Sequence, residues 1–336
     1  MINIGIMGFG RIGRDIYRLA SNHKQFNITA IGDVADPEIL YYLLASESPD
    51  FSNTKLNDNY LENGHMSTRM VRAIEPGDVP WEVFQTDFVV DATHKYRSRE
   101  DLQKHLDGGA NRVIMSSLPQ DKIDKVIVVG VNEMTIHRSD TIISAGSSTT
   151  NALILALHIL LEKYSIEAAN MTSIHSYTSD QPLQDVAGKG FRRSRSAAEN
   201  IIPNDSESLG WVGKILPVLK GKISASALNV PVQKGSLLDL SVALIDGGIT
   251  SDDIISLFES AAEKKPALIE VNHDPIVSSD VIGNTHTLVF DSQATMTTGA
   301  DLIKILAWYD NGLSQAGRIL DIIQLYHSLE KEGGTE

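Results

Sequence analysis

A chain of 336 residues is longer than a typical single domain, so two domains of about 150 residues each are expected. Its 43 acidic and 29 basic residues give a net charge of −14, which disfavours binding to nucleic acid or to anionic lipid surfaces. The absence of cysteine excludes disulfides and thiolate metal sites, and no spacing of histidines suggests a metal site. Since neither a signal peptide nor a membrane span is recognisable, we expect a cytoplasmic enzyme or binding protein without a structural metal.

The first half of the chain alternates predicted strands and helices. An apolar run over 2–7 meets a glycine turn over 8–13, after which helical spacing begins. A second strand over 27–32 is followed by Asp36 and Pro37, which are typical of a helix start. Further segments are predicted as strands over 88–92, 112–116 and 125–129, and as a helix over 99–106. This order predicts an α/β fold with a doubly wound, Rossmann-type parallel sheet.

The pattern changes near residue 148. A helix over 149–164 precedes strand-like segments over 170–177, 225–230 and 237–244, which suit an α+β catalytic domain with a mostly antiparallel sheet. The stretch 178–204 lacks clear periodicity and is expected to be a long functional loop, and an amphipathic helix is predicted over 315–329. We therefore predict a dinucleotide-binding domain at 1–147, a catalytic domain at 148–312, and a C-terminal helix within 313–336 that packs back on the first domain.

The glycine turn matches the GxGxxG pattern at Gly8, Gly10 and Gly13, directly after a predicted strand and at the start of a predicted helix. These glycines permit a tight turn, close approach of a pyrophosphate, and packing of the helix on the strand. Asp33 ends the second strand, where a carboxylate can bind the adenosine ribose and repel a 2′-phosphate. The pattern predicts NAD as cofactor, bound by residues 8–13 (Gly8, Phe9, Gly10, Arg11, Ile12 and Gly13) together with Asp33. The alternative is a glycine turn without a ligand.

The segment Ser144-Ala145-Gly146-Ser147-Ser148-Thr149-Thr150-Asn151 places hydroxyl groups at a predicted helix start, which favours negative charge. It resembles the Ser-Cys-Thr-Thr-Asn active-site motif of the phosphorylating glyceraldehyde-3-phosphate dehydrogenase family, to which erythrose-4-phosphate dehydrogenases are closely related. Ser148 occupies the cysteine position. The resemblance extends along nearly the whole chain, through the motifs Gly8-Phe9-Gly10-Arg11-Ile12-Gly13-Arg14, Gly130-Val131-Asn132, His175-Ser176-Tyr177-Thr178-Ser179-Asp180-Gln181, Asn200-Ile201-Ile202-Pro203 and Trp308-Tyr309-Asp310-Asn311.

The resemblance implies NAD-dependent aldehyde oxidation, in which the nucleophile at position 148 attacks and His175 takes the proton. It also implies a homotetramer in which the long loop reaches toward a neighbour's cofactor. The remaining implied site residues are Thr178 for the phosphate of the substrate, Ser147, Thr149 and Arg193 for inorganic phosphate, Asn311 for the nicotinamide carboxamide, and Thr93 and Ser116 in the cofactor cleft.

Three departures from the family pattern bear on function. An alcohol at Ser148 must surrender its proton during attack, whereas a thiol ionises readily. Asn229 stands where the family has an arginine on the substrate phosphate, which removes a charge-assisted hydrogen bond of about 1.5–3 kcal/mol. Ser206 and Glu207 replace a threonine-glycine pair, and a carboxylate about 4 Å from a phosphate costs roughly 4 kcal/mol.

Several hypotheses remain open. The chain is either a dehydrogenase with weak or altered activity, acting on a small or phosphorylated aldehyde, or a non-catalytic NAD-binding paralogue that serves as a sensor or scaffold. A hydrolase using Ser148 and His175 lacks a recognisable acid to orient the imidazole. A Cys-to-Ser variant of an active dehydrogenase would explain Ser148, but not Asn229, Glu207, or the His94-Lys95 pair where the family usually has glycine. We therefore favour natural divergence.

Overall fold

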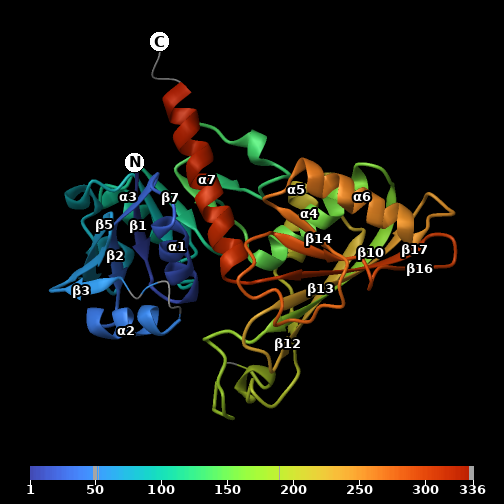
Figure 1. Cartoon of the computed structure of the whole chain (residues 1–336), viewed down its shortest axis with the longest axis horizontal. Coiled ribbons are helices and arrows are strands. Elements are labelled where there is room, and N and C mark those ends of the chain that lie inside the picture. The colour runs from blue at the N-terminus through green and yellow to red at the C-terminus, as the bar shows by residue number, and fades with distance from the viewer. Residues whose placement is uncertain (48–50, 52, 189, 333–336) are drawn as a thin grey trace. The chain divides into compact units, whose positions relative to one another are not determined.

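The computed structural model describes residues 1–47, 51, 53–188 and 190–332, and these form two compact units (Figure 1). One unit comprises Met1–Ser147 with Gln315–Glu336, and the other comprises Ser148–Ser314. Within the described residues, no helix is both long enough and apolar enough to cross a membrane. The α/β fold class predicted from the sequence is confirmed.

The described part of the first unit contains a nine-stranded sheet in the order β3-β4-β5-β2-β1-β6-β7-β9-β8. Its strands are β1 (Ile2–Met7), β2 (Phe26–Asp33), β3 (Lys55–Asn57), β4 (Tyr60–Asn63), β5 (Met66–Arg72), β6 (Phe88–Asp91), β7 (Arg112–Met115), β8 (Lys125–Val126) and β9 (Ile142–Ser144). The pairings among β5, β2, β1, β6, β7, β9 and β8 are parallel, whereas β3, β4 and β5 form an antiparallel edge. The predicted doubly wound sheet is therefore present.

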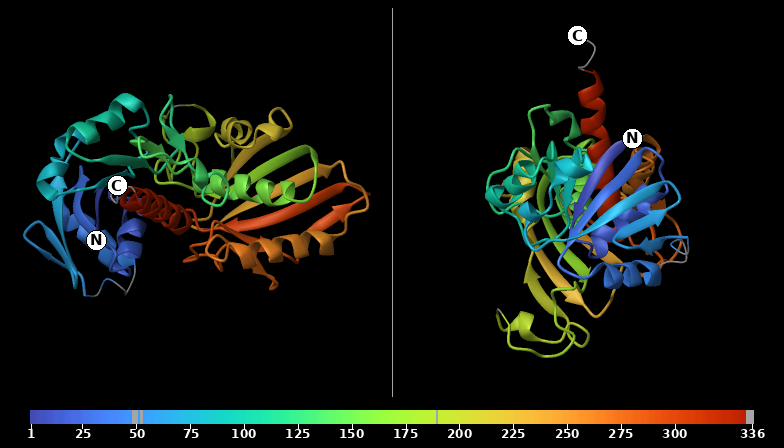
Figure 2. Two further views of the ribbon diagram at one scale, coloured as in Figure 1. Left: turned by 90° about the horizontal axis from the view of Figure 1, so that it is seen from above. Right: turned by 90° about the vertical axis from the view of Figure 1, so that its left-hand side faces the viewer.

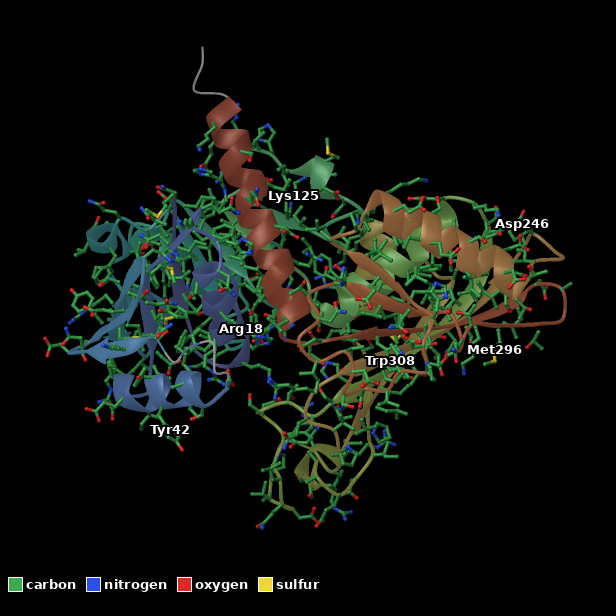
Figure 3. All side chains as sticks on the ribbon, in the orientation of Figure 1. Arg18, Tyr42, Lys125, Asp246, Met296 and Trp308 are labelled. Atoms are coloured by element: carbon green, nitrogen blue, oxygen red, sulfur yellow. The ribbon has the colours of Figure 1, made fainter. Side chains whose placement is uncertain are left out.

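Four helices pack with this sheet: α1 (Arg11–Ser21), α2 (Pro37–Glu47), α3 (Arg99–Asp107) and α7 (Leu313–Glu332). In α2, Leu40 and Leu44 are buried, while the Tyr42 side chain is 69% exposed and points away from the sheet (Figure 3). The buried face of α7 carries Ala316, Ile319, Ile323 and Tyr326, which share one core cluster with the strands β1, β2, β6, β7 and β9. Burial at this three-to-four-residue spacing explains why the C-terminal helix belongs to the first unit.

The second unit is built on a mixed sheet in the order β11-β12-β10-β13-β17-β15-β14, with β16 paired to β17 (Figures 1 and 2). Its strands are β10 (Ile166–Ser176), β11 (Ile202–Asp205), β12 (Ile223–Val230), β13 (Ser236–Leu244), β14 (Ile269–Asn272), β15 (Leu288–Asp291), β16 (Met296–Thr298) and β17 (Leu302–Tyr309). Most pairings are antiparallel, as predicted, but β10–β12 and β14–β15 are parallel.

Three helices accompany this sheet: α4 (Ser148–Leu161), α5 (Leu209–Ile215) and α6 (Ser251–Lys264). The almost fully buried helix α4 packs on β10, β13 and β17, and it also contacts α5 and α6. This burial explains why its sequence is apolar on all sides. The helix predicted over 149–164 begins one residue earlier and ends at Leu161, because the following residues turn toward β10.

Two predicted boundaries were wrong for identifiable reasons. The strand expected over 125–129 contains only Lys125 and Val126, because the Asn132 side chain binds the next backbone groups: its amide donates to the Val126 carbonyl, and its oxygen accepts from the Val128 N–H. Helix α7 begins at Leu313 because the Asp310 carboxylate accepts the N–H groups of Gly312 and Leu313.

Candidate functional site

The glycine turn after β1 has the geometry that its three glycines predict. Gly8 has φ +90°, in the left-handed region that favours glycine. A Cβ atom on Gly13 would lie 2.2 Å from the Gly8 carbonyl oxygen, so only glycine fits there. A Cβ on Gly10 would meet nothing within 4 Å, which leaves open space at the N-terminus of α1. The N-terminus of a helix favours anions, so this space fits a pyrophosphate.

Asp33 is fixed beside this turn by two backbone donors. The Phe9 N–H donates to Asp33 Oδ2 at 2.7 Å, and the Ala35 N–H donates to Oδ1 at 2.9 Å. The carboxylate thereby joins the end of β2 to the turn after β1. An acidic group in this position is suited to accept hydrogen bonds from a ribose.

The crevice at the carboxyl ends of β1 and β6 is a topological switch point, because β2 lies on one side of β1 and β6 on the other. Met7 and Asp91 are aligned in the parallel pair, so the Gly8 turn adjoins the residues after Asp91. A Cβ on Gly8 would lie 2.9 Å from the Thr93 nitrogen. Ser116, the residue directly after β7, is only 1% exposed, and its Oγ has no hydrogen-bond partner among the described residues. An orphaned buried hydroxyl there suits a polar ligand.

The side chain of Gln315, the first residue of the C-terminal portion of this unit, holds the neighbouring backbone. Its Nε2 lies 3.0–3.2 Å from the carbonyl oxygens of Ser116, Ala145 and Gly146. The contacts tie the end of β7 to the segment that follows β9. The segment ends at Ser147, immediately before α4.

Helix α4 of the second unit starts at Ser148, which is 8% exposed. The next two hydroxyls are bound within the unit: Thr149 Oγ1 lies 2.7 Å from the Tyr309 hydroxyl, and Thr150 Oγ1 lies 2.9 Å from Ser208 Oγ. Burial raises the pKa of Tyr309, which therefore stays protonated and can donate. The first turn of α4 is thus anchored, and its backbone N–H groups favour negative charge at the Ser148 oxygen.

His175 lies near the end of β10 with both ring nitrogens hydrogen-bonded. Nδ1 lies 2.6 Å from the Ser176 carbonyl oxygen, and Nε2 lies 2.8 Å from Asn311 Nδ2. A carbonyl only accepts, so Nδ1 carries the proton in the neutral ring and Nε2 accepts from the amide. Asn311 Oδ1 in turn accepts from Ser236 Oγ at 2.8 Å and Ser176 Oγ at 3.3 Å. This network leaves Nε2 as the proton-accepting atom of His175.

Asn229 lies directly across from His175 in the parallel pair β10–β12. Residues in register on neighbouring strands share a face of the sheet. The Asn229 side chain is buried, and its Oδ1 accepts from Asn204 Nδ2 on β11. A neutral amide pair therefore stands beside the imidazole.

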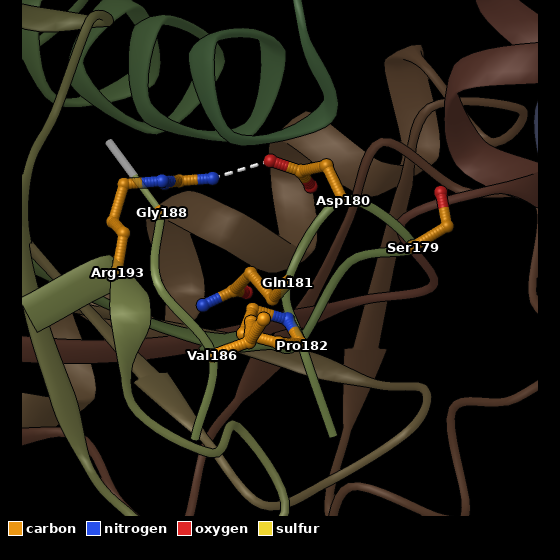
Figure 4. Close-up of a pocket in the computed structure, with 7 residues that line it drawn as sticks. All are labelled: Ser179, Asp180, Gln181, Pro182, Val186, Gly188 and Arg193. Atoms are coloured by element: carbon orange, nitrogen blue, oxygen red, sulfur yellow. Dashed lines mark hydrogen bonds and ion pairs between the residues drawn. The ribbon is translucent and has the colours of Figure 1, made fainter. Parts of the chain in front are cut away.

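The loop after β10 contains a second cluster, around Asp180 (Figure 4). The Asp180 carboxylate accepts from the Thr178 hydroxyl and pairs with the Arg193 guanidinium. A shallow hollow of about 410 Å³ lies there, lined by Ser179, Asp180, Gln181, Pro182, Val186, Gly188 and Arg193. Two residues expected to bind phosphate are thus held by one carboxylate.

Comparisons with known proteins identify the family. A family profile described as the NAD binding domain of glyceraldehyde 3-phosphate dehydrogenase matches residues 2–99, and one described as its C-terminal domain matches residues 147–311. Among curated proteins, glyceraldehyde-3-phosphate dehydrogenase 1 of Bacillus cereus is 34% identical over 96% of this chain and 97% of its own length. Those of Priestia megaterium and Borreliella burgdorferi are each 35% identical over 96% of this chain, covering 97% and 99% of their own lengths.

The chain belongs to the glyceraldehyde-3-phosphate dehydrogenase family. The resemblance inferred from the sequence motifs and the NAD cofactor are thereby confirmed, and the family is one of NAD-dependent oxidoreductases. The glycine turn and the buried Ser116 described above fit a dinucleotide.

The family residues predicted from the sequence fall into three groups in the structure. The glycine turn, Asp33 and Thr93 adjoin one another in the first unit, and His175, Asn229 and Asn311 form a contiguous group in the second. Thr178 and Arg193 meet at Asp180. Glu207 is exposed in the segment between β11 and α5, and Ser206 beside it is partly buried.

Sequence reasoning did not single out several residues that organise these groups. Tyr309 binds Thr149, Asp180 binds Thr178 and Arg193, and Gln315 binds the carbonyl of Ser116. Asp180 and Tyr309 lie inside motifs quoted for the family resemblance, so their position was a usable signal. Gln315 had no comparable signal, because an amide near a helix start is ordinary in surface sequences.

Proposed function

We propose that this chain is an NAD-dependent oxidoreductase of aldehydes whose activity on glyceraldehyde 3-phosphate is slow. The observation that carries the proposal is the Asn229–Asn204 amide pair in register with His175. Where the family pattern has an arginine beside the base, this chain has a neutral group. The missing charge-assisted hydrogen bond is worth about 1.5–3 kcal/mol of phosphate binding.

In the proposed reaction, Ser148 Oγ forms a bond to the aldehyde carbon and its proton passes to His175 Nε2. The tautomer described above supports this role, because Nε2 is the unprotonated nitrogen. Asn311 must release Nε2 when substrate binds, since its amide occupies the lone pair. Bound NAD would supply the hydride acceptor, and loss of the hydride from the adduct would leave an acyl ester on Ser148. An ester transfers its acyl group to phosphate less readily than a thioester, so release is expected to be slow.

The cofactor is proposed to lie on residues 8–13, with Asp33 on the ribose and Thr93 and Ser116 lining the cleft. The open space above Gly10 and the buried Ser116 hydroxyl support this placement. Asn311 is proposed to bind the nicotinamide carboxamide once it leaves His175.

Anion binding is proposed to involve Ser147, Thr149, Thr178 and Arg193. The Asp180 carboxylate would compete with an anion for Thr178 and Arg193, because it is hydrogen-bonded to both side chains. Glu207, beside Ser206, adds a further negative charge to the segment where the family pattern has glycine. The charge of Glu207 disfavours a phosphate group and supports a substrate without one, whereas Asp180 belongs to a motif shared with the family and does not distinguish the two kinds of substrate.

Mixing the purified chain with NAD and a panel of aldehydes, with and without phosphate groups, tests the proposal through the absorbance of NADH. We expect slow turnover of glyceraldehyde 3-phosphate and faster turnover of at least one uncharged aldehyde. Ser148→Ala and His175→Gln are the controls and should abolish the signal. Ordinary family turnover of glyceraldehyde 3-phosphate would contradict the proposal.

The competing functions give different results in the same assay. A non-catalytic NAD-binding paralogue would bind NAD and produce no NADH with any aldehyde. A hydrolase would cleave activated esters in a Ser148-dependent manner without NAD. It is disfavoured because His175 Nδ1 faces the Ser176 carbonyl and not a carboxylate. A Cys-to-Ser variant of an active dehydrogenase would regain full activity with Ser148→Cys alone.

We further propose a homotetramer, as the family resemblance implies. The long loop supports it: Leu183, Val186 and Phe191 are 58%, 54% and 98% exposed, an unusual density of apolar side chains on a surface segment. Light scattering should give four times the chain mass of 36.7 kDa. A monomer would contradict it.

A further inference from the structure

Three buried residues behind the cofactor crevice form a hydrogen-bonded chain that the proposed chemistry does not use. Trp81 Nε1 donates to His105 Nδ1 at 3.1 Å, and His105 Nε2 lies 3.3 Å from Asp91 Oδ2. Trp81 and His105 have no exposed surface, and Asp91 is 2% exposed. Buried polar groups of this kind rigidify their surroundings when every member is satisfied.

The direction of each hydrogen bond among Trp81, His105 and Asp91 is fixed. Indole N–H can only donate, so His105 Nδ1 must accept, and the ring proton sits on Nε2, facing Asp91. The histidine cannot adopt its other tautomer without placing two N–H groups against each other. The Asp91 carboxylate therefore always receives a hydrogen bond from behind.

The other oxygen of Asp91 points to the turn after β6. Oδ1 accepts from the Thr93 N–H at 3.0 Å and from the Thr93 hydroxyl at 2.6 Å. Thr93 Oγ1 in turn accepts from the Lys95 N–H at 3.2 Å. His94, between them, has φ +59°, in the left-handed region that a residue with a side chain rarely adopts. The hydrogen bonds to Asp91 hold that unfavourable turn in place.

The held turn is part of the cofactor crevice. Thr93 adjoins Gly8, since a Cβ on Gly8 would lie 2.9 Å from both its nitrogen and its Cγ2. Trp81 also packs against the strand that leads to the glycine turn, because a Cβ on Gly5 would lie 2.4 Å from its ring. The same tryptophan thus packs against β1 and, through His105 and Asp91, supports the turn after β6.

We propose that Asp91, His105 and Trp81 are positioning residues for NAD binding, acting through the Thr93–Lys95 turn without touching the cofactor. The inference rests on the cofactor placement proposed above. It requires that loss of the hydrogen bonds among Trp81, His105 and Asp91 weaken NAD binding by more than the loss of stability explains. A side chain at position 105 with the same order of acceptor and donor should restore the affinity.

Substitutions at His105 separate these requirements, with NAD affinity measured by calorimetry and stability by thermal unfolding. His105→Leu introduces an apolar side chain of similar size and removes both hydrogen bonds, so NAD binding should weaken about tenfold. His105→Gln can accept from Trp81 through its oxygen and donate to Asp91 through its nitrogen, so it should restore most of the affinity. Trp81→Phe removes only the donor and serves if His105→Leu does not fold.

Thr68→Val is the matched control. Its hydroxyl is buried on β5 and donates to the Ile28 carbonyl at 2.7 Å, far along the sheet order from β6. It should lower the unfolding temperature and leave NAD affinity unchanged. If His105→Leu also changed only the unfolding temperature, the chain would be a purely structural feature and the proposal would be wrong.

A second variant tests the route through His94. Glycine adopts the left-handed conformation without strain. Adding His94→Gly to the His105→Leu variant should therefore recover most of the NAD affinity that His105→Leu loses. Failure of His94→Gly to recover any affinity would overturn the role assigned to the turn. These measurements need no aldehyde, so failure of the proposed chemistry would not affect them. A Gly10→Val variant that still bound NAD normally would instead refute the cofactor placement itself.

Discussion

The nucleotide-binding and catalytic units of this chain depart from the family pattern to different degrees. In the first unit, recognition is built from backbone geometry: the positive φ of Gly8, the contact of Gly13 with Gly8, and N–H groups aimed at Asp33. In the second unit, the proposed site is built from side chains, and the departures inferred from the sequence motifs, at Ser148, Asn229 and Glu207, are side-chain changes.

This difference has a physical origin. Gly8 and Gly13 tolerate almost no substitution, because a residue with a Cβ would have a disfavoured φ at Gly8 and would meet the Gly8 carbonyl at Gly13. A polar side chain on a sheet face can be exchanged for another of similar size at little cost in stability, while its ligand changes. Cofactor binding is therefore expected to persist even if substrate choice differs from that of the family, as proposed above.

The largest expected effect is on aldehyde oxidation, when the side chains of the family pattern are introduced into the second unit. The triple variant Ser148→Cys, Asn229→Arg, Glu207→Gly should raise glyceraldehyde 3-phosphate oxidation by about a thousandfold, since several kcal/mol of nucleophile and phosphate effects are recovered together. The gain should exceed the combined gains of the single variants, because attack needs the nucleophile and a positioned substrate at once. Steady-state NADH production measures it.

Ser148→Cys alone tests the nucleophile position. A thiol at the N-terminus of α4 should have a depressed pKa and react with iodoacetamide faster than free cysteine, and more so if His175 lies within reach of it as the proposed reaction requires. It should not by itself restore phosphate-dependent turnover. Full activity from this single change would show that Asn229 and Glu207 are unimportant, and it would favour the Cys-to-Ser alternative.

The next largest effect concerns the first unit. Gly13→Ala places a methyl group 2.2 Å from the Gly8 carbonyl oxygen, so it should lower the free energy of unfolding by about 3 kcal/mol and abolish detectable NAD binding. Gly10→Ala, with nothing within 4 Å, is the matched control and should leave stability nearly unchanged. Equal stability of the two variants in urea unfolding would contradict the structure of the turn.

A smaller effect is expected in cofactor selectivity. The wild-type chain should bind NAD at least about tenfold more tightly than NADP, because the Asp33 carboxylate repels a 2′-phosphate. Asp33→Asn keeps an oxygen for the Phe9 N–H and removes the charge, so the preference should shrink, with a stability loss of about 1 kcal/mol because the Ala35 N–H loses its acceptor. Calorimetry that showed equal or tighter NADP binding by the wild type would contradict the assignment.

The sequence predicted the backbone features well because they depend on local rules. The glycine spacing, the alternating strands and helices, and the change of pattern at residue 148 were all readable. The true end of β8 was not, since it depends on the Asn132 side chain folding back on residues 126 and 128. A strand end that is set by one side-chain amide leaves no periodic signal in the sequence.

The sequence predicted which residues belong to the candidate site, but it did not predict which of them are hydrogen-bonded to one another. His175 and Asn311 both stand in recognisable motifs, but their hydrogen bond joins positions 136 residues apart through the sheet order. The hydrogen bond between Asp91 and His105 also depends on packing, since it joins β6 to helix α3, which lies beside β7 and β9. Such contacts depend on tertiary packing, which a single sequence does not encode locally.

The smallest expected effect is on stability in acid and compares a carboxylate from each unit. Partial burial opposes ionisation of Asp124, but hydrogen bonds from the Arg99 side chain, the Ile142 and Thr141 N–H groups and the Thr141 hydroxyl lower its pKa to about 2. Because this value lies below the ordinary 3.8, the stabilisation is complete above about pH 4 and is lost as the pH falls toward 2.

Asp124→Asn should therefore lower the free energy of unfolding at pH 7 by about 1–2 kcal/mol, after allowance for solvent screening. The difference from wild type should shrink as urea titrations move from pH 5 to pH 3. Asp239→Asn is the control from the second unit: its carboxylate lies 2.9 Å from Lys304 on neighbouring strands, a partly exposed ion pair worth at most about 1 kcal/mol. A loss for Asp124→Asn that stayed constant with pH would mean that its hydrogen bonds, and not its charge, stabilise the edge of the nucleotide-binding sheet.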